Sequence, residues 1–259
     1  MGAFRSSRRH ALRAFIISCS AFAELIASAG GGAFLRRDYI TASNLGRPAS
    51  FLNQVTALAP MSPSDLGGRM EELTDFYGGV DAGKVYLFSA WPTPDLRPYA
   101  WHLEGHPPLM LRPPGKAPGD PPDLHIEEVR TKAELGRFEE IVIRGFPLDG
   151  LDPLQTGALV DPSALSNGRL RCWVGYHGGR PLCASSVFVD SGVNNVTLVV
   201  TLPEARGRGF GEAITWRATC ANPQSPALLL SSDLGRGVYE RMGYLPLIRL
   251  SVWTRTFAA

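Results

Sequence analysis

The sequence predicts an α/β fold of mixed, mostly antiparallel sheets flanked by helices, arranged as two tandem copies. Its 259 residues are 44% apolar and 19% charged, which is typical of a packed globular chain of one or two domains. Strand-like and helix-like patterns alternate after residue 123. A proline-rich segment at 107–123 breaks the pattern near the middle of the chain. We therefore expect an N-terminal domain over 1–115, a linker over 116–122 and a C-terminal domain over 123–259.

The N-terminal stretch predicts the first helix of the folded protein. Arg8 and Arg9 precede an apolar segment over 14–29, as in an export signal that begins with paired arginines. Glu24 interrupts that segment, and the segment is too short to span a bilayer. An exported protein is the alternative interpretation. We expect the chain to act in the cytoplasm.

The first half also contains a degenerate copy of elements that recur in the second half. The pattern of a strand at Val85–Trp91, a short helix at Trp101, a glycine and a further strand resembles the pattern that follows Ala227. In this comparison Gly105 matches Gly243, and Trp101 stands at the position of Tyr239. A helix over 64–77 would match one over 209–220. An unrelated α/β domain is the alternative.

The second half is predicted element by element from periodicity and turn residues. A helix over 132–144 has apolar residues at helical spacing, and a His-Gly-Gly-Arg turn joins two strands into a hairpin. The predicted strands are 125–130, 171–176, 181–190, 193–202 and 227–231, and the further helices are 209–220 and 236–242. A last strand, or a pair of strands, is expected over 245–255.

The overall charge and the cysteines exclude several classes of function. A net charge of +2 gives no general attraction to nucleic acid or to an anionic membrane, so neither is expected as a partner. The four cysteines are scattered and form no C-x-x-C pair, which argues against a disulfide scaffold and a zinc site. We therefore expect reduced thiols and no metal; the cysteines are Cys19, Cys172, Cys183 and Cys220.

A glycine-rich turn between a predicted strand and a predicted helix favours an anion site. The segment Arg206-Gly207-Arg208-Gly209-Phe210-Gly211 follows the strand over 193–202 and opens the next helix. Backbone N–H groups at the start of a helix bind phosphate groups, and arginines add charged donors. The segment lacks the endings of a Walker loop and the spacing of a dinucleotide-binding fingerprint. On its own this turn also fits an ordinary loop.

Two motifs together resemble the GNAT N-acetyltransferase superfamily. Arg206-x-x-Gly209-x-Gly211 is similar to its acyl-CoA pyrophosphate loop. The stretch from Ser232 to Tyr244 is similar to its later motif N-x-x-A-x-x-x-Y-x-x-x-G-[FY], with Ser232 in place of Asn and Gly235 in place of Ala. The motifs cover about 193–250, and the order of strands extends the resemblance to about 123–257.

The resemblance implies a role for each matching residue. Tyr239 would protonate the leaving thiolate of CoA, as a phenol near that sulfur can; its alternative is a core aromatic. The backbone of Val199, Val200 and Thr201 would bind the pantetheine arm where the sheet splays. The remaining residues that would bind acetyl-CoA are Arg206, Gly207, Arg208, Gly209, Phe210, Gly211, Glu212 and Ser232.

The implied function is transfer of an acetyl group from acetyl-CoA to a primary amine by direct attack in a ternary complex. A non-catalytic acyl-CoA-binding module, regulatory or structural, is the alternative. No carboxylate lies on the strand over 193–201, so Asp190, Glu128 and a chain of waters are equal candidates for the base and none is assigned. The acceptor amine and a homodimeric state stay open.

Overall fold

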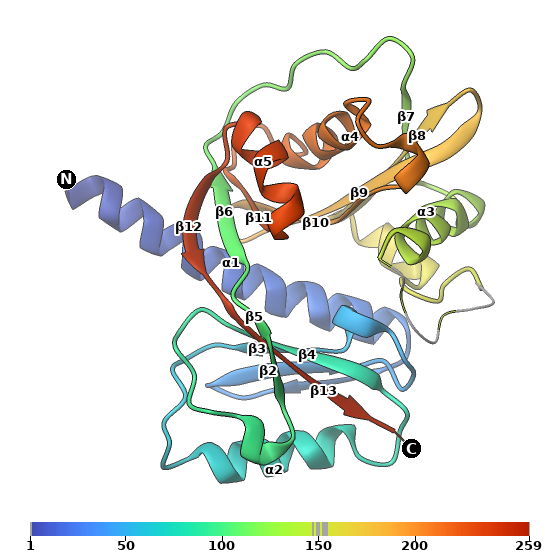
Figure 1. Ribbon diagram of the computed structural model, residues 1–259. Helices are drawn as coiled ribbons and strands as arrows, with labels where there is room; N and C mark the ends of the chain where they lie inside the picture. Colours follow the sequence, from blue (N-terminus) through green and yellow to red (C-terminus); the bar gives the residue numbers. More distant parts are fainter. Residues whose placement is uncertain (1, 147, 149–150, 152–154, 259) are drawn as a thin grey trace.

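The computed structural model describes residues 2–146, 148, 151 and 155–258, which form two sheets with helices against them (Figure 1). We call the N-lobe the six-stranded sheet ordered β1-β2-β3-β4-β13-β5 together with helix α2. We call the C-lobe the seven-stranded sheet ordered β12-β6-β11-β10-β9-β8-β7 together with helices α3, α4 and α5.

The elements of the first half are mostly short. They are α1 (Gly2–Ala29), β1 (Ala33–Arg36), β2 (Ile40–Asn44), β3 (Gln54–Ala57), α2 (Leu66–Tyr77), β4 (Gly83–Ser89), β5 (His102–Gly105) and β6 (Pro108–Arg112). Short 3-10 turns lie at Ser50–Leu52 and Arg97–Tyr99.

The elements of the second half follow the predicted order. They are β7 (His125–Glu128), α3 (Lys132–Gly145), β8 (Leu170–His177), β9 (Arg180–Asp190), β10 (Val193–Thr201), α4 (Phe210–Thr219), β11 (Ala227–Leu230), α5 (Asp233–Arg241), β12 (Leu245–Arg249) and β13 (Ser251–Phe257). Helix α3 starts where predicted because Thr131 and Glu134 form a reciprocal capping box.

Each lobe receives one strand from the other half of the chain. β6 comes from the first half and lies between β11 and β12 of the C-lobe. β13 comes from the second half and lies between β4 and β5 of the N-lobe. The division at 116–122 therefore separates most of each sheet, but β6 and β13 cross it in opposite directions. This exchange ties the lobes together through one strand just before residues 116–122 and one near the end of the described chain.

The exchange corrects the expectation for the last residues. The stretch 245–255 is two strands in two different sheets, separated by buried Leu250. The break at 107–123 likewise includes an interior strand, β6, at its beginning. Pro108 is tolerated there because it is the first residue of the strand.

The internal repeat is consistent with the two sheets, but its predicted residue alignment is wrong. Trp101 does not lie on a helix: it directly precedes β5, fully buried. Gly105 lies within β5 and pairs with Val252, whereas Gly243 lies between α5 and β12. In the order of elements, β5 therefore corresponds to β12, and β6 corresponds to β13. The strands β6 and β13 are the two that the lobes exchange.

Helix α1 lies between the two sheets (Figure 1). It contacts β1, β2 and β3 on one side and β9 and β10 on the other. Residues Arg8–Ala29 are long and apolar enough to cross a membrane by length and composition, and 50% of the most apolar window is buried inside the protein. The apolar residues that resembled an export signal thus pack against both sheets.

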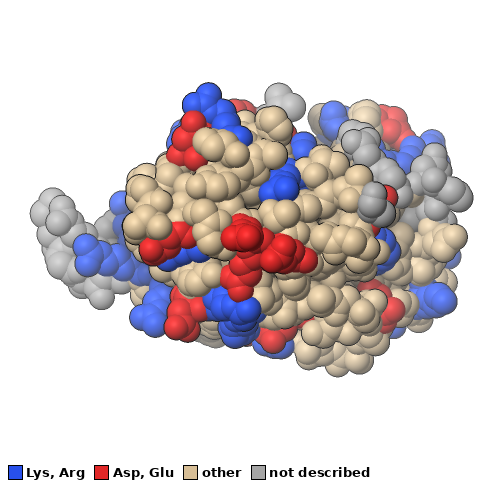
Figure 2. Space-filling view, turned by 90° about the horizontal axis from the view of Figure 1, so that it is seen from below, with Lys and Arg blue, Asp and Glu red and all other residues tan. Residues whose placement is uncertain are grey.

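Helix α2 covers the outer face of the N-lobe and carries Glu71, Glu72 and Asp75. Figure 2 views the molecule from this side, where Asp and Glu side chains gather near the middle of the face.

Candidate active site

Strands β10 and β11 separate soon after they meet. They pair with each other in parallel only at Asn194 with Ala227 and at Asn195 with Leu228. Beyond these residues both strands continue without pairing to each other. Buried Asn194 fixes this junction, because its amide donates to the carbonyls of Thr219, Asn222 and Ser225 and accepts from the Asn222 N–H. The strands therefore leave an opening with unpaired backbone groups along its edge.

A β-bulge turns β10 within this opening. Between Thr197 and Val200 the register against β9 shifts by one residue, and Leu198 has φ of 52°. The N–H of Leu202 donates to Leu182 of β9 at 3.0 Å. Because backbone groups alternate along a strand, Val200 faces β9, whereas Val199 and Thr201 face the opening. Binding of a pantetheine arm by the backbone of these three residues stays a prediction.

The glycine-rich turn brings the start of α4 to the end of β10. Gly209 is the N-cap residue with φ of 79°, a conformation that favours glycine, and it has no side chain to cap the helix. A Cβ on Gly211 would lie 2.8 Å from the Thr201 Oγ1, so glycine permits this close approach. The first N–H groups of α4 have no partner within the helix. Free N–H groups at a helix start suit an anionic ligand, and these lie at the end of β10.

The two arginines of the turn are held differently. The Arg206 Nε donates to the Thr201 carbonyl at 3.2 Å, on the side of the opening. The Arg208 guanidinium lies 3.2 Å from the Asp123 carboxylate and 2.9 Å from the His177 Nε2. It also lies over the ring of buried Phe210 at 4.7 Å. Both side chains remain exposed, whereas Glu212 is half-buried in the first turn of α4.

On the far side of the opening, α5 carries the other predicted residues. Ser232 is its N-cap, and the Oγ accepts from the Gly235 N–H at 3.1 Å. The expected bond from Ser232 to a cofactor therefore competes with helix capping. Tyr239 packs edge-on against Tyr244, with ring centroids 5.9 Å apart, and burial raises the pKa of Tyr239 to about 12. Its phenol is therefore protonated at neutral pH.

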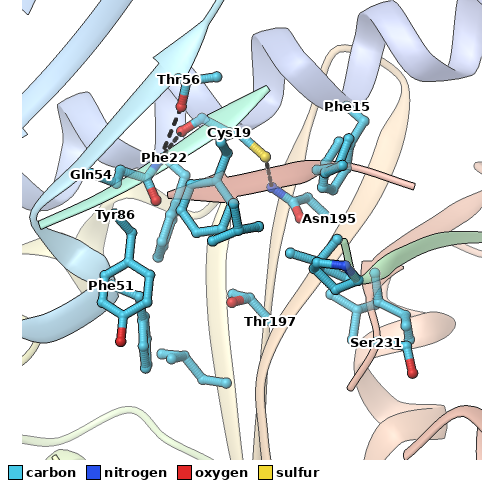
Figure 3. A pocket seen from close by; sticks show the side chains of 18 of the residues that line it. Phe15, Cys19, Phe22, Phe51, Gln54, Thr56, Tyr86, Asn195, Thr197 and Ser231 are labelled. Carbon is cyan, nitrogen blue, oxygen red and sulfur yellow. Dashed lines mark hydrogen bonds between the residues drawn. The ribbon is translucent and has the colours of Figure 1, made fainter. Parts of the chain in front are cut away.

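A cavity of about 580 Å³ joins the opening to the interface between the lobes. Val199, Ser232 and Tyr239 line one part of it, so they face a common space. Figure 3 shows Phe51 and Tyr86 across this cavity from Asn195 and Ser231. The wall opposite β10 comes from the N-lobe and α1, and includes Phe15, Cys19, Phe22, Phe51, Gln54, Thr56, Tyr86, Phe88 and Glu104.

Sequence analysis missed this second wall. Cys19, Phe15 and Phe22 belong to α1, whose apolar spacing indicates a core helix and gives no sign that some positions face a cavity. The Asn195 amide lies 3.6 Å from the Cys19 Sγ, and burial raises the pKa of that thiol to about 12. The thiol is therefore protonated, and thus a poor nucleophile, at neutral pH.

Neither candidate base lies in this cavity. Glu128 accepts from Arg171 at 2.7 Å and also contacts Arg130, and these bonds hold its pKa below the usual range. Asp190 pairs with Arg169 at 2.9 Å and accepts from the Ser191 hydroxyl. Both carboxylates thus have partners elsewhere in the C-lobe. Within the described residues there is no group of three or more His, Cys, Asp or Glu that could hold a metal ion.

Comparison with family models finds no match, and a search of curated proteins finds none either. Solved structures do match. A GCN5-related N-acetyltransferase from Kribbella flavida has a TM-score of 0.67 and 18% identity, over 91% of this chain and 95% of that one. A GCN5-related N-acetyltransferase from Sphaerobacter thermophilus has a TM-score of 0.56 and 14% identity, over 85% and 78%. A tandem GNAT protein from the clavulanic acid biosynthesis pathway has a TM-score of 0.50 and 14% identity, over 78% and 74%. These likenesses confirm the predicted fold.

Proposed function

We propose that this chain, which has the GNAT acetyltransferase fold, transfers an acetyl group from acetyl-CoA to a primary amine in the cytoplasm. The fold supports acyl transfer in general. The choice of acetyl-CoA, the amine and the direct mechanism rest on the residues of the C-lobe.

One observation carries the proposal. The opening between β10 and β11 has a helix start without a side-chain cap at one end and a half-buried tyrosine, protonated at neutral pH, at its side. An acyl-CoA has a pyrophosphate, an extended amide arm and a thioester in that order. The α4 N-terminus suits the pyrophosphate, the backbone edge of β10 near Val199 suits the amides, and Tyr239 suits the sulfur.

The proposed reaction is aminolysis of the thioester. The neutral amine nitrogen attacks the thioester carbonyl carbon, the carbon–sulfur bond breaks, and the sulfur takes a proton from the Tyr239 hydroxyl. The amine loses one proton as the amide forms, and Tyr239 regains a proton before the next turnover. The products are the acetamide and CoA.

The cysteine in the cavity supports direct attack over a covalent carrier. An acyl-enzyme on Cys19 would require its thiolate. Burial raises the pKa of Cys19 to about 12, and the amide of Asn195 is the side-chain group that contacts its sulfur. A thiol held in this way is a poor nucleophile, so both substrates would bind before transfer.

Thermal denaturation with acetyl-CoA tests the binding half of the proposal. Ligand at about 100 times its Kd adds roughly 2.7 kcal/mol to the stability of the folded state, which raises the Tm by several degrees for a chain of this size, at roughly 2–4 °C per kcal/mol. The same protein should release CoA thiol only when an amine is added. No shift with acetyl-CoA, CoA or longer acyl-CoAs would overturn the proposal, and binding without turnover of any amine would favour a regulatory module.

A further inference from the structure

We propose that the acceptor is a small aromatic monoamine without a carboxylate, bound in the cavity between the lobes with its ammonium attracted to Glu104. This inference rests on the proposed acetyltransferase activity and names the class of its acceptor. Glu104 is assigned as a residue that determines specificity.

The cavity wall contains an array of partly exposed aromatic rings. Phe51 lies 5.4 Å from Phe146 and 6.4 Å from Tyr86, edge-on in both cases, and Tyr86 stacks nearly parallel to Phe88 at 6.2 Å. All four rings line the cavity. Phe146 is 40% exposed, and the other three are half-buried. An aromatic ligand would cover these faces and edges in the geometries that aromatic pairs prefer.

The rings come from both lobes, so the array exists only where the lobes meet. Tyr86 and Phe88 are on β4, Phe51 is in the 3-10 turn at Ser50–Leu52, and Phe146 ends α3. The array therefore faces the C-lobe strands that form the opening. A molecule on these rings lies in the same cavity as Tyr239.

The cavity has one acidic side chain and no cationic one. Among the described residues that line it, Glu104 is the only carboxylate, and none is Lys, Arg or His. An ammonium entering this apolar space finds a charge partner. A carboxylate would find no cation among the lining residues, since the nearby Lys84 ammonium lies over the Tyr86 ring at 5.3 Å and already pairs with Glu104. The charge pattern thus favours a monoamine over an amino acid.

Glu104 is anchored but still able to accept further bonds. The Thr254 hydroxyl donates to its Oε2 at 3.1 Å, and Lys84 lies 3.3 Å from the same carboxylate. The Glu104 and Lys84 side chains are 48% and 43% exposed, so their ion pair is weak. A carboxylate accepts about four hydrogen bonds, which leaves room for an ammonium on the cavity side. Lys84 does not line the cavity.

The size of the cavity sets the class of acceptor. A volume of about 580 Å³ lies within the range of small-molecule sites and must hold the acetyl end of the donor as well. A polyamine would bring several charges to one carboxylate among aromatic rings. A single-ring arylalkylamine satisfies both the rings and Glu104. Its ammonium loses a proton to solvent before the neutral nitrogen attacks the thioester.

Competing acceptors test the inference directly. Acetyl transfer from acetyl-CoA, followed as release of the CoA thiol, is compared for 2-phenylethylamine, phenylalanine, ethanolamine and spermidine. We expect kcat/KM for 2-phenylethylamine to exceed that of each of the others at least tenfold. A preference for phenylalanine, ethanolamine or spermidine would overturn the inference, as would acetyl-CoA binding without acylation of any of the four.

Variants separate the role of Glu104 from folding and from donor binding. Glu104→Gln should lower kcat/KM for 2-phenylethylamine about tenfold, mainly through KM, with the Kd for acetyl-CoA unchanged. Glu127→Gln, the same change on an exposed glutamate of β7, is the matched control and should have no effect. An unchanged KM in Glu104→Gln would contradict the assignment. If the wild-type chain fails to bind acetyl-CoA, the proposed function fails first, whatever the acceptor.

Discussion

The two lobes place similar elements in similar order but differ where a phosphate would bind. In the C-lobe, β10 leads through a glycine-rich turn to α4, which Gly209 opens without a side-chain cap. In the N-lobe, β3 leads to α2, whose N-cap residue is Asp65; its carboxylate makes no capping hydrogen bond, so the lobes differ in the charge at the helix start. The Asp65 carboxylate lies 3.3 Å from Arg69 and accepts from the Ser64 hydroxyl. A carboxylate at a helix start occupies the electrostatic place of an anionic ligand.

The lobes also differ in how far the first strand of this unit extends beyond its parallel partner, and in the segment that follows that partner. β3 and β4 pair over three residues and β3 then ends at once, whereas β10 continues for six residues beyond its last pair with β11. Between β4 and β5 the N-lobe has only the turn at Arg97–Tyr99, followed by fully buried Trp101. The comparison teaches that the N-lobe retains the sheet and supplies one wall of the cavity, and it supports our proposal that the chemistry takes place in the C-lobe.

The largest expected effect is on turnover at Tyr239. Tyr239→Phe removes only the acidic hydroxyl, so kcat should fall about 100-fold, equivalent to about 2.7 kcal/mol in the barrier. The Kd for acetyl-CoA should not change. Tyr99→Phe, the corresponding change near the 3-10 turn of the N-lobe, should leave kcat intact. Equal kcat values for wild type and Tyr239→Phe would contradict the proposal that the chemistry takes place in the C-lobe.

The loop at 157–160, which contacts residues of both halves of the chain, should affect the stability of the fold rather than turnover. Buried Glu139 of α3 accepts from the N–H groups of Gly157, Leu159 and Val160 at 2.7–2.9 Å. Arg47 of the N-lobe donates to the carbonyls of the same loop. Glu139→Gln places an amide among these donors and should lower the free energy of unfolding by about 2 kcal/mol.

Denaturant titration measures this change, and exposed Glu140→Gln is the control, with an expected change below about 0.5 kcal/mol. A stability loss as small as that of the control would show that the Glu139 carboxylate does not stabilise this loop.

A smaller effect is expected at the arginines beside the two helix starts. Arg208→Ala should weaken acetyl-CoA binding roughly threefold to fivefold, because the guanidinium is exposed and already pairs with Asp123. Arg69→Ala, beside the α2 N-terminus, should change the Kd by less than the error of calorimetry. A larger loss at Arg69 than at Arg208 would point to the N-lobe as the binding lobe.

The pH dependence should show no contribution from Tyr239 in the usual tyrosine range. Its folded pKa is raised by burial to about 12, so the proton that it donates stays in place as pH rises through 10. In a pH profile, kcat should not fall between pH 8 and 10.5 through loss of this proton. A decline with an apparent pKa near 10 that is absent from Tyr239→Phe would contradict the burial of the phenol.

Sequence reasoning reached the C-lobe because its signals are local. The turn at 206–211 and the stretch from Ser232 to Tyr244, which contains α5, can be recognised from residue types at fixed spacing. The exchange of β6 and β13 depends on pairing between distant segments, and apolar strands of this kind fit either sheet. Glu104 could not be predicted for the same reason. It differs from other exposed glutamates only in its position across the cavity from the C-lobe, and the exchanged strands set that position.

Titration calorimetry with acetyl-CoA tests the central claim, that one lobe alone binds the donor. We predict one site per chain. Gly209→Asp, which gives α4 the N-cap residue of α2, should weaken that site at least tenfold, because its carboxylate meets the pyrophosphate at the helix start. Gly192→Asp is the matched control, since Gly192 also has a positive φ of 76° and open surroundings but lies in the β9–β10 turn. Two sites per chain, or one site that survives Gly209→Asp unchanged, would contradict the account.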